Sequence, residues 1–157
     1  MSGSLPDAAS AGVRQPQARS ASQLPFEGSF TVDSHSAFVP PNTLVITGTG
    51  EGTATHLGRS TVAWLDNVDT NTATSTGTFT LKAANGDQIF AATTGHEESF
   101  VPPNISSTIV IATIQGGTGR FVDASGMLTI HGVQAIDFVN GTASGSQTIT
   151  GQINIEQ

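Results

Sequence analysis

The stretch STGTFTLKAANGDQIFAATTG, residues 75–95, is the clearest structural signal in the chain. Phe79 and Leu81 alternate with threonines, and this period of two predicts a strand with one buried face. The following turn centres on Asn85-Gly86, a pair that readily adopts the positive φ angles of a type I′ turn. The stretch is therefore predicted to form a β-hairpin.

The same kind of pattern continues on both sides of this hairpin, and no stretch shows a 3.6-residue period. About eight antiparallel strands follow one another, joined mostly by tight turns. An open sheet of this size would expose two edges, and closing it into a barrel removes both. We therefore predict an all-β fold, an eight-stranded antiparallel up-and-down barrel, whose interior is filled by side chains or holds one small ligand. The further segments typical of strands are residues 28–34, 43–55, 60–65, 107–115, 126–141 and 144–156.

The first 25 residues differ from the rest of the chain, because they are small and polar with scattered proline and arginine. They are predicted to form a flexible N-terminal arm, either a dispensable tail or a lid over a pocket. Residues 26–157 are predicted to form a single β-barrel domain. The arm lacks the apolar segment of a signal peptide, so a cytoplasmic location is expected. Secretion is the alternative, if a signal peptide has been removed from the natural protein.

Composition excludes several kinds of partner. The net charge is −7 and Lys82 is the single lysine, which argues against binding to nucleic acid or to an anionic membrane surface. Cysteine is absent, so disulfides and thiol chemistry are excluded. Whether the barrel forms a homo-oligomer is left open.

A pentapeptide, Phe-Val-Pro-Pro-Asn, occurs twice, at residues 38–42 and 100–104. Each copy precedes a long apolar strand. Pro-Pro has no amide hydrogen to donate, so it cannot lie in the middle of a sheet. The two copies are predicted to form equivalent crossings at one rim of the barrel, with Phe and Val tucked inward. A gate for a ligand is the alternative.

The segment IQGGTGRFVDASGMLTI, residues 114–130, is the most specific motif. Its Gly-Gly-Thr-Gly-Arg-Phe core resembles the signature segment of the allene oxide cyclase and dirigent barrel superfamily. GTATHLGRST, residues 52–61, is similar to stretches in uncharacterised bacterial proteins of this barrel type. The resemblance covers about residues 27–157. It implies that segment 114–130 joins two strands through a small helical turn, which packs its Phe into the barrel end.

The resemblance also implies a class of chemistry. Members of the superfamily guide the cyclisation or isomerisation of an apolar molecule without a metal or redox cofactor, and bacterial polyketide cyclases are built on the same barrel. The implied function is a cofactor-free cyclase or isomerase acting on a polyketide-like or lipid-like substrate by shape, orientation and desolvation. The alternative is a non-catalytic barrel, secreted or not, that binds a ligand or is purely structural.

Candidate site residues follow from the alternation of the strands. His56 shares the parity of the apolar residues of its strand and is the candidate catalytic residue, orienting a carbonyl at the barrel mouth. A rim histidine bonded to a neighbouring carbonyl is the alternative. No metal site is expected, because the four histidines are far apart and form no His-x-His pair. The candidate substrate-binding residues are Trp64, Phe79 and Met127, expected to face inward, and Phe38 and Phe100 at the rim.

Overall fold

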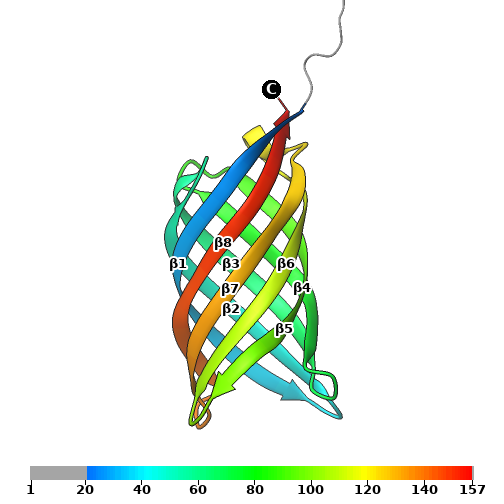
Figure 1. Cartoon of the computed structure of the whole chain (residues 1–157), viewed down its shortest axis with the longest axis vertical. Helices are drawn as coiled ribbons and strands as arrows, with labels where there is room; N and C mark the ends of the chain where they lie inside the picture. Colours follow the sequence, from blue (N-terminus) through cyan, green and yellow to red (C-terminus); the bar gives the residue numbers. More distant parts are fainter. Residues whose placement is uncertain (1–20, 157) are drawn as a thin grey trace, which may run out of the picture.

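The computed structural model describes residues 21–156, which form a closed barrel of eight antiparallel strands (Figure 1). Each strand pairs with its neighbours in the chain, and β8 closes the barrel by pairing with β1. The predicted fold class is confirmed. The one helical segment within the described residues is a short 3-10 turn, η2 (Gly119–Phe121). The strands are β1 (Ala21–Val39), β2 (Thr43–Ala54), β3 (Gly58–Asp69), β4 (Thr74–Ala83), β5 (Gln88–Val101), β6 (Ile105–Gly117), β7 (Ser125–Asp137) and β8 (Thr142–Glu156).

The barrel has two distinct ends (Figure 1). We call the end where β1 begins, β8 finishes and η2 lies the closed end. The other end carries the hairpin turns β1–β2, β3–β4, β5–β6 and β7–β8, and we call it the open end.

Strand β1 begins at Ala21, five residues before the predicted start of the barrel domain. Residues 21–25 pair with residues 152–156 of β8. Leu24 lies opposite Ile153 and packs against the core, because it continues the inward alternation of Phe26. The prediction that the arm extends to residue 25 is therefore wrong at that end. The rest of the predicted arm, residues 1–20, lies outside the described residues.

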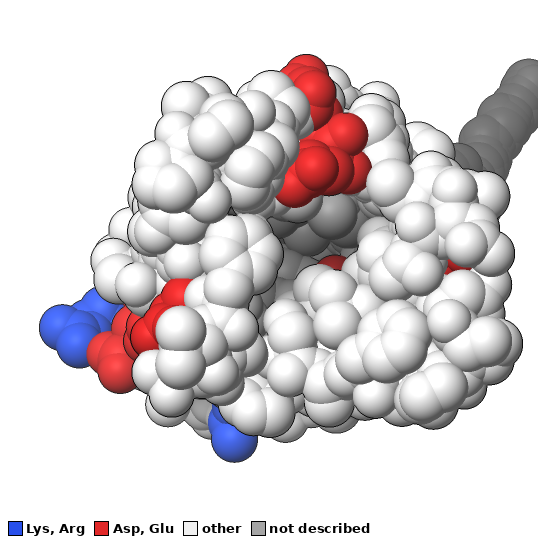
Figure 2. All heavy atoms as spheres, turned by 90° about the horizontal axis from the view of Figure 1, so that it is seen from below, with Lys and Arg blue, Asp and Glu red and all other residues white. Residues whose placement is uncertain are grey.

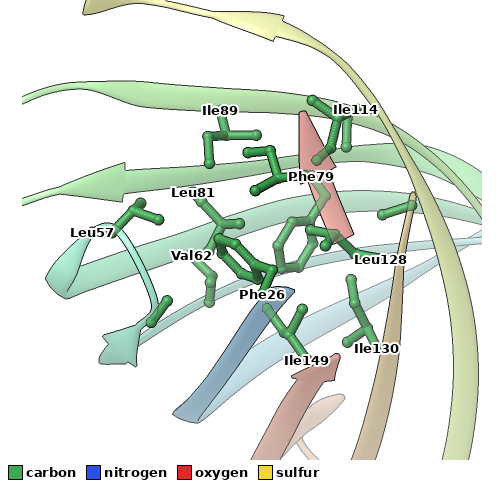
Figure 3. Close-up of a cluster of buried hydrophobic side chains, with 14 of the residues drawn as sticks. Phe26, Leu57, Val62, Phe79, Leu81, Ile89, Ile114, Leu128, Ile130 and Ile149 are labelled. Atoms are coloured by element: carbon green, nitrogen blue, oxygen red, sulfur yellow. The ribbon is translucent and has the colours of Figure 1, made fainter. Parts of the chain in front are cut away.

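Inward side chains of all eight strands fill the closed end of the barrel. Figure 3 shows Phe26, Val62, Leu81, Leu128 and Ile149 converging from different strands. Each is at most 1% exposed, and burial of a large apolar side chain stabilises the fold by roughly 1.5–3 kcal/mol. This half of the interior is therefore a packed core.

The glycine-rich segment after β6 forms η2, and its Phe121 is completely buried. A Cβ atom at Gly119 would collide with the carboxylate of Asp87, so only glycine allows this close approach. The structure thus contains the small helical turn with an inward Phe that the resemblance implies, and this turn covers the closed end.

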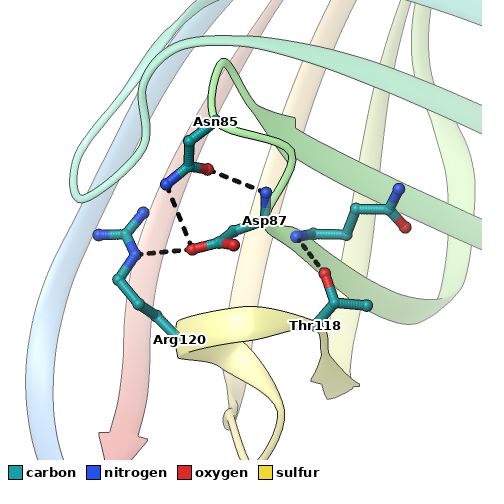
Figure 4. Close-up of polar contacts among 5 residues, drawn as sticks. Asn85, Asp87, Thr118 and Arg120 are labelled. Carbon is teal, nitrogen blue, oxygen red and sulfur yellow. Dashed lines mark hydrogen bonds and ion pairs between the residues drawn. The ribbon is translucent and has the colours of Figure 1, made fainter.

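Polar contacts tie η2 to the β4–β5 hairpin (Figure 4). Arg120 Nε donates to Asp87 Oδ2 at 3.0 Å, and the Gln88 amide donates to Thr118 Oγ1 at 3.0 Å. The hydrogen bond from Arg120 holds the pKa of Asp87 below its usual value. The turn of the β4–β5 hairpin therefore holds η2 in place over the closed end of the barrel.

The β4–β5 turn is not of type I′, so that prediction is wrong. Type I′ requires positive φ at two successive residues, but in this turn only Gly86 has it, with φ of 96°. The Ala83 backbone amide donates a hydrogen bond to the Asp87 carbonyl oxygen, and the Gly86 backbone amide donates one to the Ala83 carbonyl oxygen. The loop is therefore three residues long, and Gly86 is the last residue of the four-residue turn that begins at Ala83.

The two Phe-Val-Pro-Pro-Asn copies form the β1–β2 and β5–β6 turns, both at the open end as predicted. The prediction that their Phe and Val side chains are tucked inward is wrong, because Phe38, Val39, Phe100 and Val101 are 41–57% exposed. These residues lie beyond the last paired residues of β8 and β4, so each has a neighbouring strand on one side only.

The asparagine that ends each copy links its hairpin to the next one. The Asn42 carbonyl accepts a hydrogen bond from the Thr70 amide, and the Asn104 carbonyl accepts one from the Ile136 amide, each at 2.9 Å. The repeated pentapeptide thus has an equivalent architectural role in each half of the barrel.

The turns of the hairpins that these contacts reach, β3–β4 and β7–β8, also match each other. The Ala73 amide donates to the Asp69 carbonyl at 2.7 Å, and the Gly141 amide donates to the Asp137 carbonyl at 2.9 Å. Ala73 and Gly141 both have positive φ, 59° and 70°. The β3–β4 and β7–β8 turns are therefore alike, and one has alanine where the other has glycine.

Exchanging these two residue types should have effects of opposite sign. Ala73→Gly is expected to raise the free energy of unfolding by about 0.5 kcal/mol, since relief of the left-handed strain outweighs the added chain entropy. Gly141→Ala should lower it by about 1 kcal/mol, because a tight contact of the new Cβ with the Ser36 carbonyl oxygen, 3.1 Å away, adds to the left-handed strain. Urea denaturation measures both, and a lowered stability for Ala73→Gly would contradict the argument.

Candidate functional site

A cavity of about 80 Å³ lies inside the barrel near the open end. Figure 2 looks at this end and shows it hollowed, with acidic side chains at the edge of the hollow. Unlike the core below it, the cavity has a mixed lining. The polar lining residues are Asp66, Thr93, Thr108, Gln134 and Gln147, and the larger apolar ones are Ile46, Trp64, Phe79, Val110 and Ile130.

Asp66 supplies the carboxyl group of the cavity. Burial raises the pKa of Asp66 from 3.8 to about 6, an effect that the hydrogen bond from Thr93 partly offsets. That bond joins Thr93 Oγ1 to Asp66 Oδ1 at 3.4 Å. Asp66 has no ion-pair partner among the described residues, where the one salt bridge joins Arg120 to Asp87. The carboxylate is therefore poorly compensated in its charged form.

Glycine on the intervening strand makes the Asp66–Thr93 contact possible. Asp66 on β3 and Thr93 on β5 both pair with Gly77 of β4. A Cβ atom at Gly77 would collide with the Leu65 carbonyl oxygen and would lie 2.7 Å from Asp66 Oδ1. The missing side chain lets a threonine reach a carboxylate two strands away.

Two glutamines lie on the wall formed by β7 and β8. Gln134 Nε2 and Gln147 Oε1 are buried and have no hydrogen-bond partner within the described residues. A buried polar atom without a partner costs about 1–3 kcal/mol, and nearly all such atoms in proteins are paired with protein or water. The two glutamines that carry this unpaired donor and this unpaired acceptor both line the same small cavity.

An aromatic pair lies on the β3–β4 wall. The rings of Trp64 and Phe79 are stacked, with centroids 6.4 Å apart and an interplanar angle of 19°. A Cβ atom at Gly48 would collide with the indole of Trp64, so this glycine makes room for the ring. Both aromatic side chains face inward and line the cavity, as the alternation predicts. Their role in binding stays a prediction.

His56 lies away from this cavity. It sits in the β2–β3 turn, at the closed end, where its Nε2 is 3.0 Å from the Pro25 carbonyl oxygen. This is the arrangement of the alternative prediction, a rim histidine bonded to a neighbouring carbonyl. The cavity residue nearest to it on β2 is Ile46, ten residues earlier in the chain. A catalytic role for His56 would need a second site at the closed end.

Met127 does not face inward, and that prediction is wrong. The side chain is 58% exposed, because Leu128 next to it occupies the inward position. Adjacent residues of a strand point to opposite faces, so a shift of one residue in the alternation reverses the facing. Phe38 and Phe100 lie at the rim as predicted, but both are exposed and neither lines the cavity.

Sequence reasoning missed Asp66, Gln134 and Gln147. Each interrupts an apolar series: Asp66 continues the inward positions of Val62 and Trp64, and the glutamines lie four residues after Ile130 and two before Ile149. A polar residue at an inward position of a strand was the available signal.

A larger hollow, of about 550 Å³, lies on the outer surface of β2, β3 and β4. Its charged lining residues, Glu51, Arg59 and Lys82, are all exposed. Water already solvates these groups, so nothing in this hollow requires a ligand. We therefore assign the candidate site to the interior cavity.

No protein-family model matches the chain, and searches of curated proteins and of solved structures find no match either. Within the part of the chain that the structure describes, no three His, Cys, Asp or Glu side chains form a group that could hold a metal ion. Among the same residues, no helix has the length and apolar character needed to cross a membrane. The interior cavity is therefore the feature of the molecule that indicates a function.

Proposed function

We propose that the barrel binds one small polar molecule in the cavity at its open end. The observation that carries this proposal is the unpaired pair Gln134 Nε2 and Gln147 Oε1, which faces a cavity that also contains Asp66. A ligand with both a donor and an acceptor would satisfy the two amide groups and recover the cost of burying them.

The volume of the cavity supports a ligand of only a few heavy atoms. Sites for drug-sized ligands have about 300–1,000 Å³, whereas this cavity has about 80 Å³. One water molecule needs about 10–15 Å³ on a comparable measure, so a few waters or one very small molecule would fill it. A polyketide-like substrate would require the packed core to open.

Binding should be detectable with four-atom probes of different charge. Acetamide, acetate and propylammonium are titrated against the protein, followed by Trp64 emission and by the side-chain amide signals of Gln134 and Gln147 in nuclear magnetic resonance. Ligand efficiency is at most about 1.5 kcal/mol per heavy atom, so a four-atom probe can bind no more tightly than about 0.04 mM, and dissociation constants between this limit and about 10 mM are expected. At least one probe should saturate.

Variants on β8 provide the matched control. Gln147→Leu should weaken binding of that probe about tenfold, since a polar partner is lost inside the barrel. Gln152→Leu changes an exposed residue of the same strand and should leave binding unchanged. If no probe binds up to about 100 mM, the proposal fails and a structural barrel is the better description.

A cofactor-free isomerase or cyclase, the function implied by the resemblance, is the second candidate. Its support is Asp66, because a carboxyl with a pKa of about 6 exchanges protons near neutral pH. An uncharged apolar dye such as Nile red separates the two candidates, because the acidic side chains at the edge of the hollow would repel an anionic dye. Energy transfer from Trp64 to a dye inside the barrel would favour the enzyme, and its absence would favour the small polar ligand.

A further inference from the structure

We propose that the ligand of this cavity is a small amino alcohol in its ammonium form, with ethanolamine as the smallest member of the class. This inference rests on the proposed binding function and names the chemistry of the ligand. Three groups carry it: the carboxylate of Asp66, the aromatic pair Trp64 and Phe79, and the unpaired glutamine atoms.

The carboxylate of Asp66 indicates that the ligand carries a positive charge. A carboxylate accepts about four hydrogen bonds, but Asp66 accepts one within the described residues, at 3.4 Å from Thr93. The described basic residues do not neutralise it: Arg59 and Lys82 lie on the outer surface, and Arg120 pairs with Asp87. A cation in the cavity would replace the missing partner.

The aromatic pair favours an organic cation. Trp is the best aromatic partner of an ammonium group, and such contacts strengthen away from water. Trp64 lines the same cavity as Asp66, two positions away on the inward face of β3. An ammonium group beside the indole would contact the ring and the carboxylate together.

The glutamines specify the remaining atoms of the ligand. Gln147 Oε1 is an acceptor and matches an ammonium N–H, whereas Gln134 Nε2 is a donor and needs an oxygen. A molecule with an ammonium group at one end and a hydroxyl oxygen at the other satisfies both. Ethanolamine has four heavy atoms, a size compatible with a cavity of about 80 Å³.

The negative charge around the cavity also favours a cationic ligand. The chain has a net charge of −7, and acidic side chains edge the hollow in Figure 2. Glu97 lies near the open end of β5, where its Oε2 accepts a hydrogen bond of 2.6 Å from Ser106. A negative potential at the entrance concentrates cations there.

Three isosteric probes test the proposal by titration at pH 7.5: ethanolamine, ethylene glycol and propylammonium. Ethylene glycol lacks the charge, so ethanolamine should bind at least tenfold more tightly, the usual range for a hydrogen bond to a charged group. Propylammonium lacks the hydroxyl and should bind about threefold to tenfold more weakly than ethanolamine. Equal affinity for ethanolamine and ethylene glycol would contradict the proposal that the ligand is a cation, but it would still support the proposed binding function. Binding by none of the three would overturn both.

The variant Asp66→Asn should lose at least tenfold in affinity for ethanolamine, whereas its affinity for ethylene glycol should stay within threefold. Asp33→Asn is the matched control, because Asp33 is an exposed carboxylate of β1 and should affect binding little. Unchanged ethanolamine binding by Asp66→Asn would contradict the proposal. The folding of this variant is checked by the stability measurement described below.

The pH dependence gives an independent check. Besides Asp66, the titratable side chains near the open end of the strands that line the cavity are Asp69, His96, Glu97, Glu98, His131 and Asp137, and all of these except the half-buried Asp69 are exposed. Affinity for ethanolamine should fall about tenfold between pH 7.5 and pH 5 as Asp66 is protonated. Asp66→Asn should remove most of this dependence, and an unaltered profile would assign it to another group.

A phosphate ester distinguishes a free amino alcohol from a lipid headgroup of the same chemistry. O-Phosphoethanolamine adds a dianion that the acidic mouth should repel, so it should bind at least tenfold more weakly than ethanolamine. Tighter binding of the ester would overturn the assignment to the free amine.

Discussion

Truncation of Phe121 to alanine is expected to lower the free energy of unfolding by about 3–5 kcal/mol. Phe121 is completely buried and comes from η2, the turn that covers the closed end of the barrel. Removing the ring loses its transfer free energy and leaves a cavity beneath the turn, since β-strands on all sides limit collapse. Domains are commonly stable by only about 5–15 kcal/mol, so this change removes a large part of the total.

The neighbouring residue provides the control. Val122 follows Phe121 directly but is 62% exposed, so Val122→Ala should change stability by less than about 0.5 kcal/mol. Urea denaturation followed by Trp64 emission measures both variants. A loss below 1 kcal/mol for Phe121→Ala would mean that η2 contributes little to closing the barrel.

Replacement of Asp66 with asparagine should stabilise the protein at neutral pH by about 2–3 kcal/mol. Burial raises the pKa of Asp66 to about 6 in the folded state, above the ordinary value of 3.8. The folded state therefore holds the proton more tightly than the unfolded chain, and ionisation at neutral pH opposes folding. Asparagine removes the charge and still accepts the hydrogen bond from Thr93.

The sign of the pH dependence follows from linkage. Between pH 3.8 and about 6 the folded protein binds more protons at Asp66 than the unfolded chain does, so this group makes stability fall as pH rises. Above about pH 6 both states are ionised and the cost is constant. Below pH 3.8 both are protonated and the cost is absent.

The measurement is the difference in unfolding free energy between Asp66→Asn and the wild type, taken from pH 3.5 to 8. Groups that titrate alike in both proteins cancel in this difference. It should be near zero at pH 3.5 and reach its plateau by about pH 7. A variant less stable than the wild type at pH 7.5 would show that the carboxylate is compensated in the folded state. Stabilisation by loss of a charged residue would mark Asp66 as retained for binding and not for folding.

The fold class could be predicted from local patterns in this chain. Alternation in segments such as residues 75–83 reports which face of a strand is buried, because side chains alternate across any strand whatever its partners. The pattern also placed Trp64 and Phe79 inward and both pentapeptides at one rim. These features depend on residues close together in the sequence.

The predicted inward direction of a side chain was wrong where the alternation of apolar and polar residues was ambiguous. Met127 and Leu128 are both apolar, and which one points inward depends on the register of β7 with β6 and β8. Phe38 and Phe100 are exposed because the neighbouring strands end before them, a fact of strand length around the barrel. The length of a neighbouring strand cannot be predicted from the residues of the segment itself.

The amino-acid sequence by itself determined the series of strands, and it determined their inward faces where apolar and polar residues alternate. Closure into a barrel follows from the need to pair both edges of such a sheet. Only the tertiary structure decided the candidate site. Asp66, Thr93, Gln134 and Gln147 come from four different strands, and closure of the barrel brings them around one cavity. The raised pKa of Asp66 arises from burial within that assembly, and Gly77 permits its contact with Thr93 only because β3 and β5 flank β4. Such properties depend on the distances between strands, which the order of residues along the chain does not specify.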